Sequence, residues 1–222
     1  MKTDSEIKQD ILDELAWQPN IDETQIGVIV EDGVVTLTGI VNEFSKKVAA
    51  KKAVKSVVGV KAIAEDIEVK YGDDYKKSDQ EIAKAAVNTL EWNASVPKEK
   101  VMIAVENGYI YLSGKVDWEY QKNSAKRAVA YLMGVKGVVN NIEIQPKVKP
   151  SDVKDKIARA FKRSADVDAS EILIDVEGST VRLRGTVNSI KEKEDAQSAA
   201  FRAPGIIKVK NELKVQFYPQ HA

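Results

Sequence analysis

The chain has 222 residues, of which 43% are hydrophobic and 31% are charged, and its 34 basic residues balance its 34 acidic residues. This composition is ordinary for a globular protein, and a formal net charge of zero gives no sign of a nucleic-acid-binding protein. The absence of cysteine excludes a disulfide framework and thiolate chemistry. No window approaches the ~18 consecutive apolar residues of a membrane span.

The first predicted element is an amphipathic helix over residues 5–17. Its apolar residues Ile7, Ile11, Leu12 and Leu15 share one face, and Ser5 is placed to cap its start. The same pattern returns at residues 78–92 and 151–161. Trp17 and Trp92 occupy equivalent positions at the ends of the first two of these helices. We expect both indoles to pack in a core or at its rim.

Two strands joined by a tight turn come next. Apolar residues alternate at Ile26, Val28 and Val30, a period of two that predicts a half-buried strand. The turn and second strand read DGVVTLTG, and this stretch returns as NGYIYLSG from residue 107 and as GSTVRLRG from residue 178.

The dipeptides at these turns predict their conformation. Asp32-Gly33 and Asn107-Gly108 are preferred in two-residue hairpins, whose central residues both need positive φ. The third copy has Gly178 followed by serine, so we expect a different type of turn there.

A second helix and a third strand complete the unit. Each copy has a polar residue that we expect to be the N-cap of the second helix, namely Asn42, Asp117 and Asn188. A glycine follows 20 residues after the glycine that closes the hairpin motif, and it should end the helix in the left-handed conformation; these glycines are Gly59, Gly134 and Gly205.

The repeat spacing determines the architecture. The glycines that close the hairpin motif, Gly39, Gly114 and Gly185, are 75 and then 71 residues apart. Such a period indicates tandem small domains rather than a solenoid. The predicted fold class is α+β, with three tandem domains over residues 1–74, 75–148 and 149–222. Each has the order α-β-β-α-β, with two helices on one face of a three-stranded mixed sheet.

This layout resembles the BON family, the bacterial osmotically-inducible and nodulation domain. The likeness rests on the hairpin DGVVTLTGIV, the helix ending VVGVKAI, and a final strand that reads NNIEI or KNELKV. It extends over nearly the whole chain in three copies. The resemblance implies a non-enzymatic, lipid- or membrane-binding module that is often periplasmic and linked to osmotic or envelope stress. Some cytoplasmic members sense small ligands or ions, and the family offers no catalytic motif.

Residues for catalysis are scarce in this sequence. The only histidine, His221, is next to the C-terminus, and no glycine-rich phosphate loop is present. We therefore predict no enzymatic activity, no catalytic residue, no metal site and no cofactor. Glu65 is equivalent to Asn140 and Asn211, and we expect a structural hydrogen bond at this position, with an ion ligand as the alternative. Residues 1–10 lack the apolar stretch of a secretory signal, so we expect a cytoplasmic protein, or a periplasmic one if a signal was removed.

Charge is distributed unevenly along the chain. Residues 1–74 contain 9 basic and 15 acidic residues, a net charge of −6, while each of the other two repeats has a net charge of +3. Strand parity places five basic residues among eight outward positions of the third sheet. These residues, Arg182, Arg184, Lys208, Lys210 and Lys214, form a candidate anion-binding face for phospholipid headgroups or another polyanion. The alternative is a solvated face, or one that pairs with the acidic first domain.

Trp118 and Tyr120 form a second candidate, a membrane anchor at the start of a helix in the second repeat. The alternative for Trp118 is packing at a domain junction. The leading hypothesis is a non-enzymatic protein that contacts membrane phospholipid or another polyanion, with a role in osmotic or envelope stress. The alternatives are a cytoplasmic small-ligand or ion sensor and an interaction scaffold, and the oligomeric state stays open.

Overall fold

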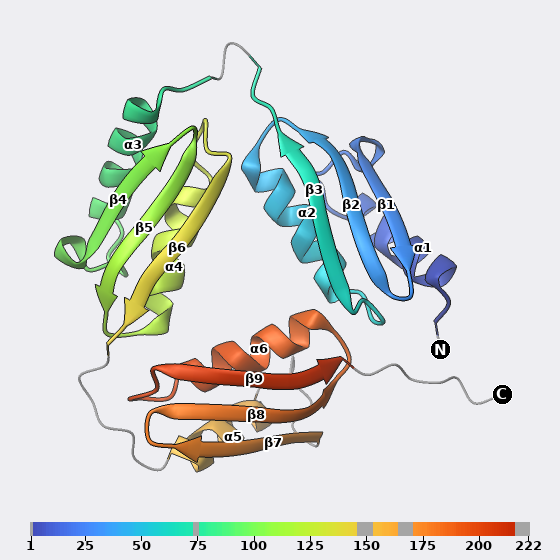
Figure 1. The fold of residues 1–222 in the computed structure, drawn as a ribbon, viewed down its shortest axis with the longest axis vertical. Helices are drawn as coiled ribbons and strands as arrows, with labels where there is room; N and C mark the ends of the chain where they lie inside the picture. The colour runs from blue at the N-terminus through green and yellow to red at the C-terminus, as the bar shows by residue number, and fades with distance from the viewer. Residues whose placement is uncertain (1, 73–75, 146–152, 164–170, 216–222) are drawn as a thin grey trace. The chain divides into compact units, whose positions relative to one another are not determined.

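The computed structural model describes residues 2–72, 76–145, 153–163 and 171–215. These residues form three sheets of three strands, each with the strands in sequence order (Figure 1). Each sheet belongs to one sequence repeat with the order α-β-β-α-β, which confirms the predicted fold class. The predicted boundaries after residues 74 and 148, and His221, lie outside the described residues.

The three domains contain equivalent elements. Domain 1 consists of α1 (Asp4–Ala16), η1 (Glu23–Gln25), β1 (Ile26–Glu31), β2 (Val34–Val41), α2 (Phe44–Ser56) and β3 (Ala62–Val69), where η marks a short 3₁₀ helix. Domain 2 consists of α3 (Asp79–Glu91), η3 (Lys98–Lys100), β4 (Val101–Glu106), β5 (Tyr109–Val116), α4 (Glu119–Ala130) and β6 (Gly137–Ile144). Domain 3 consists of α5 (Val153–Arg163), β7 (Ile172–Glu177), β8 (Thr180–Val187), α6 (Ile190–Phe201) and β9 (Lys208–Val215).

The sheets of domains 2 and 3 are mixed. β4 pairs with β5 in antiparallel orientation, as a tight hairpin requires, and β5 pairs with β6 in parallel orientation. Domain 3 repeats this pattern. A parallel neighbour needs a crossover connection, and α4 and α6 provide it. In each domain the two helices cover one face of the sheet, and Figure 1 shows α5 and α6 behind the sheet of domain 3.

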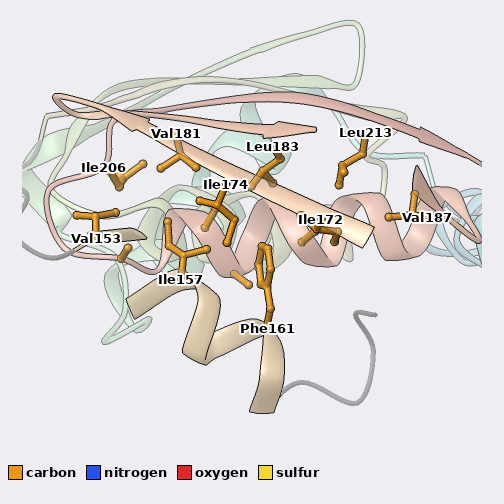
Figure 2. Close-up of a cluster of buried hydrophobic side chains, with 14 residues drawn as sticks. Val153, Ile157, Phe161, Ile172, Ile174, Val181, Leu183, Val187, Ile206 and Leu213 are labelled. Atoms are coloured by element: carbon orange, nitrogen blue, oxygen red, sulfur yellow. The ribbon is translucent and has the colours of Figure 1, made fainter. Parts of the chain in front are cut away.

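The core of domain 3 lies between this sheet and its helices (Figure 2). α5 contributes Val153, Ile157 and Phe161, spaced four residues apart on one helical face. Leu183 of β8 and Leu213 of β9 point toward them from the sheet. Small residues on α6, Ala196, Ala199 and Ala200, are buried in the same cluster and allow its backbone to approach closely.

The predicted turns and helix-ending glycines are confirmed. Both central residues of the first two hairpins have positive φ, 51° and 75° in domain 1 and 53° and 82° in domain 2. In the third turn only Gly178 has positive φ, at 55°, so its type differs as expected. Gly59, Gly134 and Gly205 have φ of 98°, 87° and 84°.

The predicted N-caps are wrong by one or two residues. The cap of α1 is Thr3 rather than Ser5, because Glu6 completes a capping box with Thr3. The N-cap positions of α4 and α6 are the residues after Asp117 and Asn188, namely Trp118, whose side chain makes no capping hydrogen bond, and Ser189. The Ser189 hydroxyl accepts a hydrogen bond from the Glu192 amide at 3.1 Å. The Asp117 carboxylate instead accepts from Lys100 Nζ at 3.1 Å.

The expected structural hydrogen bonds at the equivalent asparagines are confirmed. Asn140 Nδ2 donates to the Lys122 carbonyl on α4 at 2.8 Å. Asn211 Nδ2 donates in the same way to the Lys193 carbonyl on α6 at 2.8 Å. In domain 1 Glu65 occupies this position and forms an ion pair with Lys51 of α2. In all three domains the side chain therefore ties the third strand to the second helix.

Candidate anion-binding face

The five predicted basic residues lie on one face of the sheet of domain 3. In β8 the buried Val181 and Leu183 alternate with the more exposed Arg182 and Arg184. The strand register places Arg182 between Asp175 and Lys210, and Arg184 between Leu173 and Glu212. Lys208 and Lys214 of β9 are exposed and share the parity of Lys210. We call this surface, with Arg182, Arg184, Lys208, Lys210 and Lys214, the basic face.

The two arginines of the basic face have acidic partners. Arg182 Nε lies 3.4 Å from Glu212 Oε1, and Arg184 Nε lies 3.4 Å from Glu212 Oε2. Arg184 Nη1 is also 3.4 Å from Asp175 Oδ2. Exposed ion pairs of this kind contribute only about 0–1 kcal/mol each. The guanidinium groups are thus positioned by the sheet and held weakly by their partners.

The three lysines lie along β9 at one edge of the sheet. In the described part of the chain, no ion pair involves Lys208, Lys210 or Lys214. Alternate residues of a strand are roughly 7 Å apart on the same side, so Lys208 and Lys210 are neighbours along the edge, and Glu212 lies between Lys210 and Lys214. Counting outward residues in the sequence overstates the positive charge, because Glu177 also belongs to this face. Its position follows from strand parity, because Glu177 shares one side of β7 with Leu173 and Asp175.

Trp118 and Tyr120 lie at the start of α4 in domain 2. Trp118 is half-buried at the N-cap position, and Tyr120 is 51% exposed in the first helical turn. Residues two apart on a helix do not share a face. The structure therefore does not join these two rings into one continuous anchor.

The expectation for Trp17 and Trp92 is wrong. Their exposed fractions are 84% and 89%, the largest among the large hydrophobic side chains that the structure describes. Each is the C-cap residue of the first helix of its domain. The buried residues of α1 end at Leu15, and a residue two positions later is rotated about 200° around the helix axis. Both indoles consequently point away from the core.

Among the described residues, two of the three shifted pKa values belong to carboxylates at helix starts, and the third is the pKa of Tyr71, which is raised mainly by burial of its phenol. The pKa of Glu81 is lowered to about 2, because its carboxylate accepts hydrogen bonds from the backbone and the hydroxyl of Ser78. The pKa of Glu6 is lowered by the equivalent bonds from Thr3. Both shifts follow from capping boxes, so they mark structural positions. Among the described residues, no group of three or more acidic residues could hold a metal ion.

The three domains correspond to three matches with one family. The model of the BON domain matches residues 3–71, 78–146 and 151–216. This chain belongs to the BON family. Each match spans one α-β-β-α-β unit, so the hairpin glycines and the helix-ending glycines are shared features of three BON domains.

Osmotically-inducible protein Y of Escherichia coli (strain K12) is a relative of this BON protein. The two are 30% identical over 146 residues, which cover 63% of this chain and 72% of the relative. Two solved structures of CdsD, a structural protein of the type III secretion system of Chlamydia trachomatis, also match. The first is 17% identical with coverage of 94% and 91%, and the second, its C-terminal domain, is 16% identical with coverage of 95% and 96%. Both TM-scores are 0.26, a value too low to support an argument from shared structure.

The helices of this BON protein differ from membrane spans in length and polarity. Within the described ranges, none of them is long and apolar enough to cross a membrane.

Proposed function

We propose that this BON protein takes part in the response to osmotic stress as a non-enzymatic binding protein, and that the basic face of domain 3 contacts anionic phospholipid. Membership of the BON family and the relative named osmotically-inducible protein Y support the cellular role. The main support for the contact with phospholipid is the set of three exposed lysines on β9. They lie at an edge of the sheet, on the face that the helices do not cover (Figure 1).

The charges of this face are arranged for phosphate groups. A basic residue near an anionic membrane contributes about 1 kcal/mol, so Lys208, Lys210 and Lys214 together contribute about 3 kcal/mol. The guanidinium groups of Arg182 and Arg184 can bind a phosphate through two parallel hydrogen bonds. Exchanging their weak ion pairs for phosphate contacts loses little energy.

Trp118 and Tyr120 are the second part of the proposal. Aromatic rings with a polar group are favoured at the boundary between headgroups and acyl chains. Tyr120 is the more exposed of the two and is the ring that we propose to enter this boundary. We expect the substitution Tyr120→Ala to weaken binding less than neutralising the lysines, because a single half-exposed ring contributes little.

Co-sedimentation with vesicles tests the proposal. The full chain should bind vesicles that contain phosphatidylglycerol and bind pure phosphatidylcholine poorly. Binding should weaken as salt rises from about 50 to about 500 mM, because screening shortens the reach of surface charge to about 8 Å at physiological ionic strength. Replacing Lys208, Lys210 and Lys214 with glutamine should weaken binding about 100-fold, as about 3 kcal/mol predicts.

A matched control separates the position of the charges from their number. Lys52, Lys84 and Lys126 are exposed residues in helices of domains 1 and 2. Replacing them with glutamine removes the same charge and should leave binding nearly unchanged. Equal loss in the two triple variants would overturn the assignment of the basic face. Absence of binding to any vesicle by the unaltered chain would overturn the phospholipid proposal and favour a ligand sensor.

A further inference from the structure

The first helices of the three domains carry different charges at equivalent positions, of which two in each helix are exposed and two are half-buried. We define the outer stripe of each helix as four positions spaced i, i+3, i+4 and i+7, which share one face. The stripes are Asp10, Asp13, Glu14 and Trp17 on α1; Ala85, Asn88, Thr89 and Trp92 on α3; and Lys156, Arg159, Ala160 and Arg163 on α5. The stripe is thus acidic in domain 1, uncharged in domain 2 and basic in domain 3.

Each charged stripe borders a groove beside the second helix of its domain. In domain 1 Asp10, Asp13, Glu14 and Trp17 line it together with Lys2 and with residues 56–58 at the end of α2. In domain 3 a groove of about 420 Å³ lies between α5 and α6, with Lys156, Arg163 and Arg202 around it. The lining of the second groove also includes small or apolar residues, namely Ile157, Ala160, Ala199, Ala203 and Pro204. Equivalent places in two domains therefore present opposite charges.

Within the described residues, the hydrogen bonds of Asp13, Glu14 and Arg159 are to neutral groups and leave their charges uncompensated. Asp13 and Glu14 accept hydrogen bonds from the neutral side chains of Gln9 and Gln18, at 2.8 and 3.4 Å. Arg159 Nε donates to the backbone carbonyl of Asp155 at 3.3 Å. Asp10, in contrast, forms an ion pair with Lys2. Asp195, the acidic residue lining the groove of domain 3, is paired with Lys191 at 2.7 Å.

The equivalent region of domain 2 is apolar and aromatic. Trp92 is 89% exposed, Tyr131 is 67% exposed and Met133 is 51% exposed. Trp92 and Tyr131 occupy the positions that Arg163 and Arg202 hold in domain 3. Tyr131 and Met133 line a pocket together with Phe44 and Tyr71 of the same chain, whereas Trp92 is not part of that pocket. An exposed large apolar side chain such as Trp92 is therefore the candidate for an interaction site.

We propose that two copies of this chain form an antiparallel dimer through these helical faces. Domain 1 of one copy meets domain 3 of its partner, and the two copies of domain 2 meet each other. In a two-fold dimer the central domain contacts itself, so its surface has to be self-complementary. A charged central stripe would repel itself, whereas the uncharged stripe with Trp92 does not. In the other two contacts, domain 1 of one copy faces domain 3 of the other. Their stripes carry opposite charges, which attract the two copies and favour their antiparallel orientation.

The groove of domain 3 suits α1 of the second copy. A helix that lies in a groove is a recurrent mode of recognition, with anchors spaced three and four residues apart. Trp17 ends the acidic stripe and is the aromatic anchor of the kind that dominates interface energies. The small residues of the groove leave room for its indole, and Arg163 or Arg202 can stack on the ring.

Light scattering coupled to size exclusion tests the dimer with the full chain. The unaltered chain should be dimeric at about 50 mM salt and should dissociate as salt rises, because the outer contacts are electrostatic. Two charge reversals, Asp13→Lys with Glu14→Lys and Arg159→Glu with Arg163→Glu, should each raise the dimer Kd at least about 100-fold, since each dimer contains the contact twice. A monomer at every concentration in this low-salt buffer overturns the proposal.

Mixing the two reversed variants identifies the occupant of the groove. Each variant repels itself, but one variant's domain 1 is complementary to the other's domain 3. A one-to-one mixture should therefore restore a dimer containing both variants. If the same surfaces closed within one chain, mixing would restore nothing, and this result would exclude the second copy as the partner.

Two further variants make the test specific. Trp92→Ala, at the central contact, should raise the dimer Kd at least about tenfold, as loss of an aromatic anchor does. The control is Glu99→Lys with Glu106→Lys, two exposed residues of domain 2 outside its α-helices. This control should dimerise like the unaltered chain. Dissociation as strong as that of the stripe reversals would attribute the effect to total charge and overturn the proposed surfaces.

Discussion

At the scale of single residues, an aspartate at the start of a helix completes each of the first two hairpins. The Asp79 carboxylate accepts hydrogen bonds from the amides of Asn107 and Gly108, both at 2.8 Å. Asp4 accepts in the same way from the two turn residues of domain 1, at 2.7 and 2.9 Å. In the third repeat the sequence has Pro150 at the equivalent position. The third turn also lacks the second residue with positive φ.

Substitution of Asp79 should destabilise domain 2. We expect Asp79→Ala to reduce its free energy of unfolding by about 1–2 kcal/mol, because hydrogen bonds to a charged group are stronger than neutral ones. Hydrogen exchange of domain 2 peptides in the full chain measures this change separately from the other domains. Glu91→Ala, at the other end of α3, is the control and should have little effect. Unchanged exchange at residues 107 and 108 would contradict the assigned role of Asp79.

Residue patterns predicted part of this local structure. The Asn-Gly and Asp-Gly turns and the helix-ending glycines follow from backbone sterics, which a few neighbouring residues determine. The hydrogen bond that Asp79 accepts from the Asn107 amide joins residues 28 positions apart, and it forms only when the helix is packed beside the hairpin. Sequence spacing alone does not show it.

At the scale of elements, α1 and α3 begin with the same reciprocal cap. The Ser78 hydroxyl accepts from the Glu81 amide at 3.3 Å, and the Glu81 carboxylate accepts from the Ser78 amide at 2.9 Å. These bonds favour the ionised carboxylate and lower its pKa to about 2. The ordinary pKa of 4.5 applies to the unfolded chain. Ionised Glu81 therefore stabilises the fold above about pH 4.5, and this contribution is lost as the pH falls toward 2.

The substitution Glu81→Gln should remove this pH dependence. Glutamine can still complete a capping box, but it has no charge to lose. We expect the variant to be less stable than the unaltered chain near neutral pH, and the difference to shrink between pH 4.5 and pH 2. Denaturant unfolding across this range measures the difference, and Glu91→Gln serves as the control outside the cap. A carboxylate titration of Glu81 by NMR with a midpoint near 4.5 would contradict the shift.

Helix geometry also explains which surface residues the sequence pattern misassigns. Trp17 continues an amphipathic pattern that predicts a place near the core, yet the last core position of α1 is Leu15. At about 100° per residue, position 17 points to the opposite side. A projection of each helix down its axis that includes the C-cap residue places Trp17 and Trp92 on the side away from the core.

At the scale of the whole chain, each domain offers two different surfaces, an open sheet face and a helical face. The uneven charge of the repeats is visible in the sequence, but its meaning depends on which surface holds the charges. The basic face followed from strand parity, whereas its ion pairs with Asp175 and Glu212 required the register. The helical pattern predicts which side of α1 and α5 faces the core, but the grooves that the outer stripes border depend on how α2 and α6 pack beside them.

The two proposals together predict that dimerisation lets the protein tether two membranes. In each domain the helices and the open sheet face lie on opposite sides (Figure 1), so a dimer formed through the helical faces directs its two basic faces away from each other. The two stripe-reversed variants, tested separately and then mixed one to one, contain the same charges at equal total protein. The mixture should cluster anionic vesicles, because one dimer can bind two vesicles, whereas each separate variant should bind vesicles without clustering them. Turbidity at physiological salt measures this clustering. Turbidity of the mixture equal to the mean of the separate variants would show that the dimer does not present its basic faces to two membranes.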